Sequence, residues 1–503
     1  MTKRIFIASL FAASFFSAQA EDLYLDGTQT YTTSSGNTDT FDAATISGGS
    51  TALYTVGGTS NIGTLTIEKT TGITSNSGFE VLKGGTVNVG TVYSDGGLSN
   101  MAGTMTVTDS FCVGGYDNTK FIVKSGGKLY TNGAVLDNLN LGVNYNLRIE
   151  GYMKNVGDMV LSSQGTQAGL SISQTGIIDT DTLTLNAGYV DISGTLNVNQ
   201  ISLNTDRTLT QKFYLWPAGV LNINGSNIST LTDLTNTGVV NINAGTTQIA
   251  AKDGFKLQGG TINIKSGARL EALYFYDPGN PYTFRVTAAN SKINIYGTGI
   301  FDLGQTCGGN DMAIDGGAGV TIFSEKSNSI VANKITFFNN TTLTLNSEKT
   351  FVGEAGDYNI TLNLAQGCVA TINVNALSQF GDINLQQGSK LIFNMGSGAD
   401  SVLVLDAITQ YITHVGSIVF NDFNNEKVFF LDMSELPSFA TISGTGVNGK
   451  TLTNSDFSLI AGEFNGESGY WLYAAGVPEP STFAAIFGAS ALALALYRRR
   501  RKI

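Results

Sequence analysis

A short sequence pattern recurs through most of the chain and limits the folds that it can adopt. A glycine is followed by residues in which Val, Ile or Leu alternates with Asn or Thr, and then by a polar turn, as in GGTVNVG from Gly84 and AGVLNING from Ala218. A period of two is typical of a strand with one buried face. Gly219, Gly238 and Gly260 occupy equivalent places, 19 and 22 residues apart. The pattern therefore predicts short strands that repeat about every 20 residues.

Strands at this spacing predict an all-β fold, a right-handed parallel β-helix. Each coil would place its Val/Ile pair inward and its Asn and Thr residues outward or in turns. One coil cannot bury its apolar face alone, but stacked coils form a continuous core. At about 20 residues a coil, the repeats have room for about 20 coils. The repeats resemble the passenger repeats of autotransporters and similar bacterial surface proteins.

The pattern also divides the chain. Residues 21–420 carry the repeats, and residues 421–476 are irregular. We expect this second segment to form a β cap, because an open solenoid end exposes unpaired strand edges. Residues 1–20 and 477–503 differ from both in composition.

Charge is scarce in this chain and mostly negative. Charged residues make up 13% of the sequence, about half the usual share, and Thr, Ser, Asn and Gly take the polar positions. This composition suits stacked β-structure and disfavours helices. Residues 21–477 hold 21 basic against 38 acidic residues, a net charge of −17. An acidic body repels nucleic acid, so nucleic acid is not expected as a partner.

Acidic residues are scattered, whereas β-helix lyases and hydrolases need clustered carboxylates. The nearest pairs are Asp179 with Asp181 and Asp311 with Asp315. In a strand, Asp179 and Asp181 would point both carboxylates to the same face, as a catalytic pair would require. The interpretation preferred here is a solvated turn before TLTLN. His414 is the only histidine, and no Ser-His-Asp or Gly-x-Ser-x-Gly context is present. The sequence therefore predicts no catalytic residues and no enzyme activity.

Exposed aromatic residues could stack on sugar rings, although aromatic clusters beside proline also form the packed base of loops. The candidates for such ligand contacts are Trp216, Tyr274, Tyr276 and Tyr282.

The segment CGGNDMAIDGGAGV, from Cys307, is similar to calcium-binding nonapeptide repeats. Its two Gly-Gly pairs are eight residues apart rather than nine, and no run of copies follows. Calcium would therefore bind weakly or not at all, and a glycine-rich turn is the alternative. No other metal or cofactor is expected.

The three cysteines, Cys112, Cys307 and Cys368, form no CxxC pair. Cys307 and Cys368 would lie about three coils apart, farther than the ~7 Å that a disulfide tolerates between Cα atoms. We expect free thiols.

The start of the chain has the pattern of a secretory signal peptide. Residues 1–20 contain two basic residues, an apolar stretch over residues 5–16 and a small-x-small sequence. Ala18 and Ala20 form the predicted cleavage site, with the cut before Glu21. The body should therefore be exported.

The end of the chain has the pattern of a single membrane span. The apolar residues 483–497 would cross a bilayer core of ~30 Å only marginally, with help from snorkelling arginines. The positive-inside rule keeps the basic cluster that follows in the cytoplasm. This basic tail consists of Arg498, Arg499, Arg500, Arg501 and Lys502.

Pro478, Glu479 and Pro480, followed by the span and the Arg-rich end, resemble the bacterial PEP-CTERM sorting signal. The resemblance covers residues 477–503. It implies recognition by an exosortase at the inner membrane and removal of the tail near the motif. It also implies delivery to the cell surface or exopolysaccharide matrix of a Gram-negative bacterium.

The sequence thus predicts an exported, non-enzymatic structural or adhesive protein, with exopolysaccharide as a candidate partner. Weak contacts repeated along one face would add up through multivalency. Two alternatives stay open. Three or more acidic or aromatic side chains in one groove would favour a carbohydrate-binding or carbohydrate-active β-helix, and a uniform Asn/Thr face would count against it. A mature chain that keeps its span would be a membrane-retained envelope protein.

Overall fold

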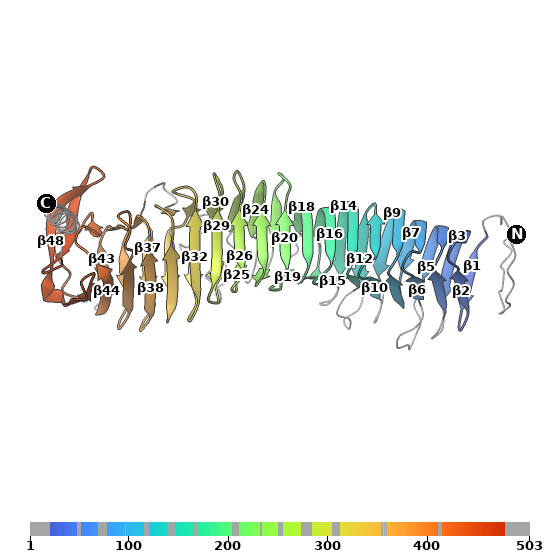
Figure 1. Ribbon diagram of the computed structural model, residues 1–503, viewed down its shortest axis with the longest axis horizontal. Helices are drawn as coiled ribbons and strands as arrows, with labels where there is room; N and C mark the ends of the chain where they lie inside the picture. The colour runs from blue at the N-terminus through green and yellow to red at the C-terminus, as the bar shows by residue number, and fades with distance from the viewer. Residues whose placement is uncertain are drawn as a thin grey trace, which may run out of the picture. The chain divides into compact units, whose positions relative to one another are not determined.

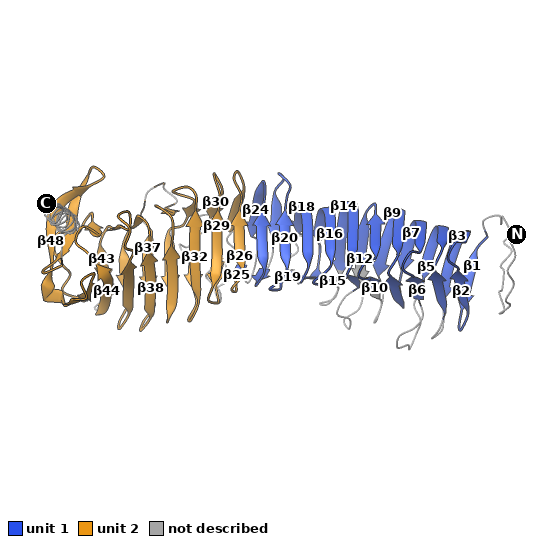
Figure 2. Cartoon of the chain, viewed as in Figure 1, with its two compact units in different colours: residues 1–255 blue, residues 256–503 orange. Residues whose placement is uncertain are grey.

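The computed structural model describes residues 21–477, except for 48–51, 69–77, 96, 115–119, 139–145, 164–168, 204–210, 232–233, 250–254, 273–283, 304–311, 354–355, 357, 359 and 411–414. The described residues form two compact units, residues 1–255 and 256–503 (Figure 2). Both are built from β-strands stacked turn after turn (Figure 1), with η1 (Asn454–Asp456) as a short 3-10 helix. The predicted β-helix repeats are confirmed as a parallel β-solenoid.

In unit 1 the strands form two long faces, A and B, and a short face C. Face A consists of β1 (Leu23–Asp26), β3 (Thr38–Ser47), β5 (Thr59–Ile67), β7 (Thr86–Ser94), β9 (Thr104–Gly114), β11 (Lys128–Thr131), β12 (Ala134–Asn138), β14 (Tyr152–Ser163), β16 (Ile177–Leu185), β18 (Thr195–Leu203), β20 (Val220–Ile223) and β23 (Val239–Ile242). Face B consists of β2 (Thr30–Thr33), β4 (Leu53–Val56), β6 (Gly78–Val81), β8 (Leu98–Met101), β10 (Lys120–Val123), β13 (Leu147–Ile149), β15 (Gly169–Ile172), β17 (Gly188–Ile192), β19 (Gln211–Leu215) and β22 (Leu234–Asn236). Face C consists of β21 (Ser229–Leu231) and β24 (Thr246–Ile249).

Unit 2 has the same three kinds of face and a fourth, face D. Face A consists of β26 (Thr261–Ile264), β29 (Ser291–Ile295), β32 (Gly319–Ser324), β35 (Thr341–Leu345), β38 (Val369–Val374), β41 (Lys390–Met395), β44 (Gly416–Phe423), β46 (Ala440–Gly446) and β47 (Thr451–Leu452). Face B consists of β25 (Phe255–Leu257), which starts one residue before the unit, β28 (Phe284–Val286), β31 (Met312–Ile314), β34 (Lys334–Phe337), β37 (Thr361–Leu364), β40 (Ile383–Leu385) and β43 (Ile408–Gln410). Face C consists of β27 (Arg269–Ala272), β30 (Ile300–Asp302), β33 (Ile330–Val331) and β36 (Phe351–Val352), and face D of β39 (Ser378–Phe380), β42 (Leu403–Leu405), β45 (Val428–Phe430), β48 (Phe457–Phe464) and β49 (Glu467–Ala474).

The alternating sequence pattern becomes an alternation of buried and outward side chains. In β20, Leu221 and Ile223 are buried, whereas Asn222 between them is half-buried on the outward side. Parallel pairing places Leu221 beside Leu196 of β18 and Val240 of β23. Like side chains from successive turns therefore stack on one another, and their burial forms the continuous core that the repeats predict.

The turns are longer and less regular than the predicted 20 residues. Ladder partners one turn apart are separated by 18 residues at Asp179 and Asn197, but by 31 residues at Asn263 and Asn294. The strands of face A keep their register in both places. The additional residues must therefore lie in the connections between faces.

Glycines form a column at one corner of unit 1. A Cβ atom on Gly194 would lie 2.2 Å from the carbonyl oxygens of Gly176 and Ser173, and one on Gly238 would lie 2.3 Å from that of Gly219. Real Cβ contacts are essentially never shorter than 3.0 Å. Only glycine permits this approach of one turn's backbone to the next. The predicted equivalence of Gly219 and Gly238 thus has a physical reason.

Antiparallel strands occur near the end of the described chain, in unit 2. β48 and β49 form a hairpin, and β49 pairs antiparallel with β45. The side chains of Trp471 and Phe464 pack against the buried Phe429 beneath them.

The last described residues are held by hydrogen bonds from two asparagine side chains. Asn448 donates to the carbonyl of Gly476, and Asn425 donates to the carbonyl of Val477, each at 3.0 Å.

Among residues 21–477 as described, there is no helix with the length and apolarity that a membrane span requires. The predicted signal peptide with Ala18 and Ala20 lies outside the described residues. So do the sorting motif Pro478, Glu479 and Pro480, the predicted span and the basic tail. Glu21 is the first residue described.

Candidate functional site

Asparagine side chains on the outward side of face A in unit 1 form a hydrogen-bonded ladder. Asn241 donates to Asn222 at 2.7 Å, and Asn222 donates to Asn197 at 2.6 Å. Asn197 in turn donates to the carboxylate of Asp179 at 2.6 Å. These residues occupy the same position on β23, β20, β18 and β16. All the amides donate in the same direction along the ladder. The ladder ends at the carboxylate of Asp179, which accepts hydrogen bonds without donating any.

Unit 2 repeats this arrangement on its own face A. Asn421 donates to Asn394 at 3.0 Å, and Asn394 donates to Asn373 at 2.8 Å. Asn373 continues the ladder to the hydroxyl of Thr344 at 2.8 Å. Neutral amides, rather than ion pairs, therefore connect neighbouring turns along this side of the solenoid.

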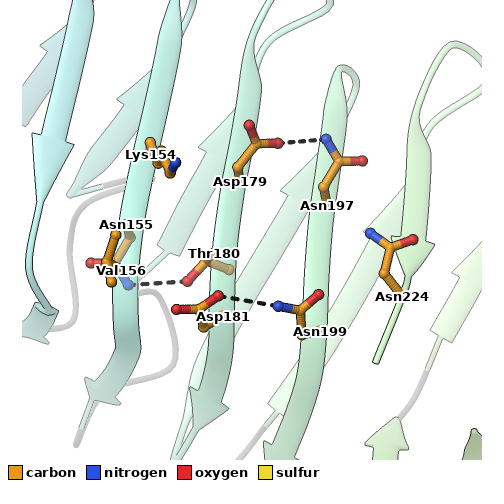
Figure 3. A pocket seen from close by; sticks show the side chains of 9 residues that line it. All are labelled: Lys154, Asn155, Val156, Asp179, Thr180, Asp181, Asn197, Asn199 and Asn224. Carbon is orange, nitrogen blue, oxygen red and sulfur yellow. Dashed lines mark hydrogen bonds between the residues drawn. The ribbon is translucent and has the colours of Figure 1, made fainter. Parts of the chain in front are cut away.

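A pocket of about 340 Å³ opens on face A of unit 1, where the ladder reaches Asp179. Its lining comes from neighbouring strands β14, β16 and β18 and from Asn224, which follows β20. Figure 3 shows Asp179 and Asp181 side by side on one strand, with Asn197 and Asn199 facing them from the next. Asn199 donates to Asp181 at 3.1 Å. The pocket thus presents carboxylates and amides from successive turns.

The prediction that Asp179 and Asp181 share one face is confirmed, because both lie in β16 with their side chains outward and Thr180 buried between them. The preferred interpretation, a solvated turn, is wrong, because both residues lie within a paired strand. Asp179 accepts hydrogen bonds from Tyr152 and Asn197, both at 2.6 Å. The sequence could not identify Tyr152 as a partner, since it lies 27 residues away in another turn.

A β-bulge in β14 hollows the face next to these carboxylates. The register between β14 and β16 shifts between Asn155 and Asp158, and Gly157 inside the bulge has a φ of 90°. A bulge re-aims the residues around it. The backbone N–H of Gly157 donates to Asp181 at 3.0 Å, so the bulge directly holds one wall of the pocket.

Asn155 fixes the bulge from inside the solenoid, where the residue is 2% exposed. Its carbonyl oxygen accepts from the Thr131 hydroxyl at 2.7 Å and from the Gly133 N–H at 3.1 Å. Its amide donates to the Gly157 carbonyl and the Thr180 hydroxyl, both at 3.0 Å. The floor of the pocket is therefore ordered by a fully hydrogen-bonded buried amide.

The hydrogen bond to Asp179, together with burial, raises the pKa of the Tyr152 hydroxyl to about 12. Because the protonated hydroxyl is the donor, this bond should contribute fully to stability below pH ~10, and the contribution should disappear as the pH rises through about 12. We expect the Asp179→Asn substitution to lower this pKa toward 10. The ring ¹³Cζ shift of Tyr152, assigned with Tyr152→Phe, measures it, and an unchanged midpoint would contradict the assignment.

Trp216 is the one aromatic ligand candidate within the described residues, and its side chain is 51% exposed just after β19. Tyr214, two residues before it, is stacked on Tyr189 of β17 with ring centroids 6.1 Å apart. Tyr189 and Tyr214 are not among the predicted ligand contacts, although the alternation of β17 and β19 places both outward. The other candidates, Tyr274, Tyr276 and Tyr282, lie outside the described residues.

The second carboxylate pair is described only in part. Asp315 forms an ion pair with Arg285 at 2.8 Å, whereas Asp311 lies outside the described residues, as does His414. Gly317, from the calcium-like segment, has a φ of 78° in a turn. Within the described part of the chain, no group of three or more His, Cys, Asp or Glu residues is placed to hold a metal ion.

Cys368 carries a free thiol, as expected for it, and Cys307 lies outside the described residues. The Cys368 thiol donates to the carbonyl of Phe338 at 2.7 Å. Burial raises its pKa to about 11. A thiol that stays protonated is a poor nucleophile, so Cys368 has a packing role rather than a reactive one.

No protein-family model matches the chain, and no curated protein matches it either.

Proposed function

We propose that the chain is an exported, non-enzymatic structural or adhesive protein of the cell surface or extracellular matrix. The observation that carries this proposal is the repetition of the same polar side chains on the outward side of face A. In each unit, Asn amides occupy equivalent places on successive strands and bond to one another. Such a surface offers the same neutral polar contact many times, and repeated weak contacts gain avidity when they bind together.

The two ends of the sequence support export and sorting. In this proposal residues 1–20 are removed on export, and the PEP-CTERM-like segment 477–503 holds the chain in the inner membrane through a single helix until an exosortase removes the tail. The body then reaches the cell surface or matrix, where exopolysaccharide is its partner.

In this proposal the coil of the solenoid is right-handed, which is the hand that connections between parallel strands favour.

The anchoring of the last described residues supports removal of the tail. Asn448 and Asn425 hold the carbonyls of Gly476 and Val477, and Val477 itself is 5% exposed. Lys450 also donates to the carbonyl of Ala475. These contacts all lie among the described residues up to Val477, so a cut near the motif would leave them in place.

The intact mass of the protein from native membrane and extracellular fractions tests the sorting proposal. We expect an extracellular species that lacks residues 1–20 and the tail near Pro478. A species that still contains Ile503 and occurs only in membranes would contradict it. That result would instead favour the membrane-retained envelope protein.

A second candidate function is carbohydrate binding, and the pocket on face A of unit 1 favours it. Two carboxylates and several amides converge there. This is one side chain short of the three acidic or aromatic groups that would favour this function, but it breaks the uniform Asn/Thr face that would count against it. Such groups can orient a sugar by hydrogen bonding.

A further inference from the structure

We propose that the pocket beside Asp179 and Asp181 binds one pyranose ring of an uncharged glycan. The pocket is lined by β14, β16, β18 and Asn224. This inference rests on the proposed function, since it names the ligand class that a matrix protein would hold at this place.

The polar groups of the pocket have hydrogen-bonding capacity left over. An Asn amide has two N–H donors, and Asn197 and Asn199 each give one to a neighbouring carboxylate. An ionised carboxylate accepts about four hydrogen bonds, whereas Asp179 and Asp181 accept two each. Remaining donors and acceptors therefore lie next to one another. A hydroxyl group both donates and accepts, so the hydroxyl groups of a sugar match this mixture.

The pocket also has an apolar wall. Val156, in the bulge of β14, is 49% exposed and lines the pocket together with Asp181 (Figure 3). A pyranose ring combines hydroxyl groups with C–H faces, and binding sites for small molecules pair apolar walls with a few placed polar groups. Val156 can cover such a C–H face while the carboxylates and amides bind the ring's hydroxyls.

Charged ligands fit the pocket less well. An anion would face the carboxylates of Asp179 and Asp181. A metal cation would face the ammonium group of Lys154 and the N–H donors already directed at both carboxylates. No third acidic side chain joins the two carboxylates within the described residues to complete a metal site. A neutral polyol avoids both conflicts.

The size and rigidity of the pocket agree with a small ligand. Its volume of about 340 Å³ lies at the lower end of the ~300–1,000 Å³ of ligand pockets. Its walls stand on paired strands, and Asn155 fixes the bulge from below. Little has to be ordered when the ligand binds, so the pocket is pre-organised.

Titration of neutral sugars into the full chain, purified from the cells that make it, tests this site. The probes are methyl β-glucopyranoside, methyl α-mannopyranoside and methyl β-galactopyranoside. Saturation-transfer-difference NMR detects their binding. We expect at least one to bind, and Asp181→Asn and Val156→Trp each to weaken it about tenfold or more, because one removes a charged acceptor and the other fills the pocket. Asp109→Asn, an exposed carboxylate of β9 on the same face, is the matched control and should leave the affinity unchanged.

Three results would overturn the site. The first is that none of the three sugars binds. The second is that both pocket variants bind as tightly as the unaltered chain while their melting temperatures are unchanged. The third is that binding requires calcium and is lost with EGTA. This test and the mass measurement that tests sorting can fail independently. If the chain binds sugar but keeps its tail, the sugar site is supported and the sorting proposal is overturned. If the chain is processed and extracellular but binds no sugar, the sorting proposal is supported and the sugar site is overturned.

Discussion

Replacing Gly194 with alanine is expected to lower the free energy of unfolding by about 3 kcal/mol or more. The new Cβ would lie 2.2 Å from two carbonyl oxygens, those of Gly176 and Ser173. Both belong to the backbone of the neighbouring turn, so neither can rotate away as a side chain could. The Gly176 carbonyl also accepts the N–H of Thr195 at 2.9 Å, so relief of the clash would strain a hydrogen bond between turns. Urea unfolding followed by far-UV circular dichroism measures the loss.

Neighbouring glycines provide a control for this prediction. A Cβ on Gly58 would lie 2.3 Å from the Ser34 carbonyl, whereas one on Gly57 would meet nothing closer than 3.4 Å. Gly58→Ala should therefore be strongly destabilising and Gly57→Ala should change stability by less than about 1 kcal/mol. Equal effects at the two positions would show that lost glycine flexibility, rather than crowding between turns, determines the cost.

Replacing Asn155 with alanine is expected to cost about 3 kcal/mol and to disturb the pocket as well. The substitution leaves the buried Thr131 hydroxyl and the partly buried Gly133 N–H without their acceptor. It also removes the amide that holds the Gly157 carbonyl in the bulge. Urea unfolding gives the stability, and the amide NMR shift of Gly157 reports whether the bulge has moved.

Asn222→Ala is the matched control, because Asn222 is a half-buried ladder residue on the outward side of the same face. Water can replace its hydrogen bonds, so its loss should cost less than about 1 kcal/mol. If Asn155→Ala costs no more than Asn222→Ala, the buried amide does not fix the bulge.

The buried residues of the solenoid core could be predicted from the sequence, because the alternation of apolar and polar residues within a single strand determines which side chains point inward. The alternation in VLNI of β20 directly gives Leu221 and Ile223 as buried. The same local rule predicts Asp179 and Asp181 on one face. Turn length could not be predicted, since the connections between faces carry no periodic signal, as the 31 residues between Asn263 and Asn294 show.

The pocket depends on contacts between turns, which one turn's sequence does not specify. Tyr152 reaches Asp179 only because β14 pairs with β16, and the hollow exists only because one extra residue in β14 shifts that pairing after Asn155. A glycine and a polar residue in an alternating segment can indicate a bulge. Which neighbouring residues it then exposes depends on the register of three strands at once.

The variation in turn length, from 18 to 31 residues between ladder partners, has a consequence for how such a chain can change over generations. Adding residues to a corner leaves the strands on either side in register, so natural variants can gain or lose corner segments singly. Adding one residue inside a strand of face A would send the following side chains of that strand to the opposite side, unless a bulge absorbed it as in β14. Insertions and deletions among descendants of this gene should therefore collect at the corners, where new surface loops can arise without loss of the scaffold.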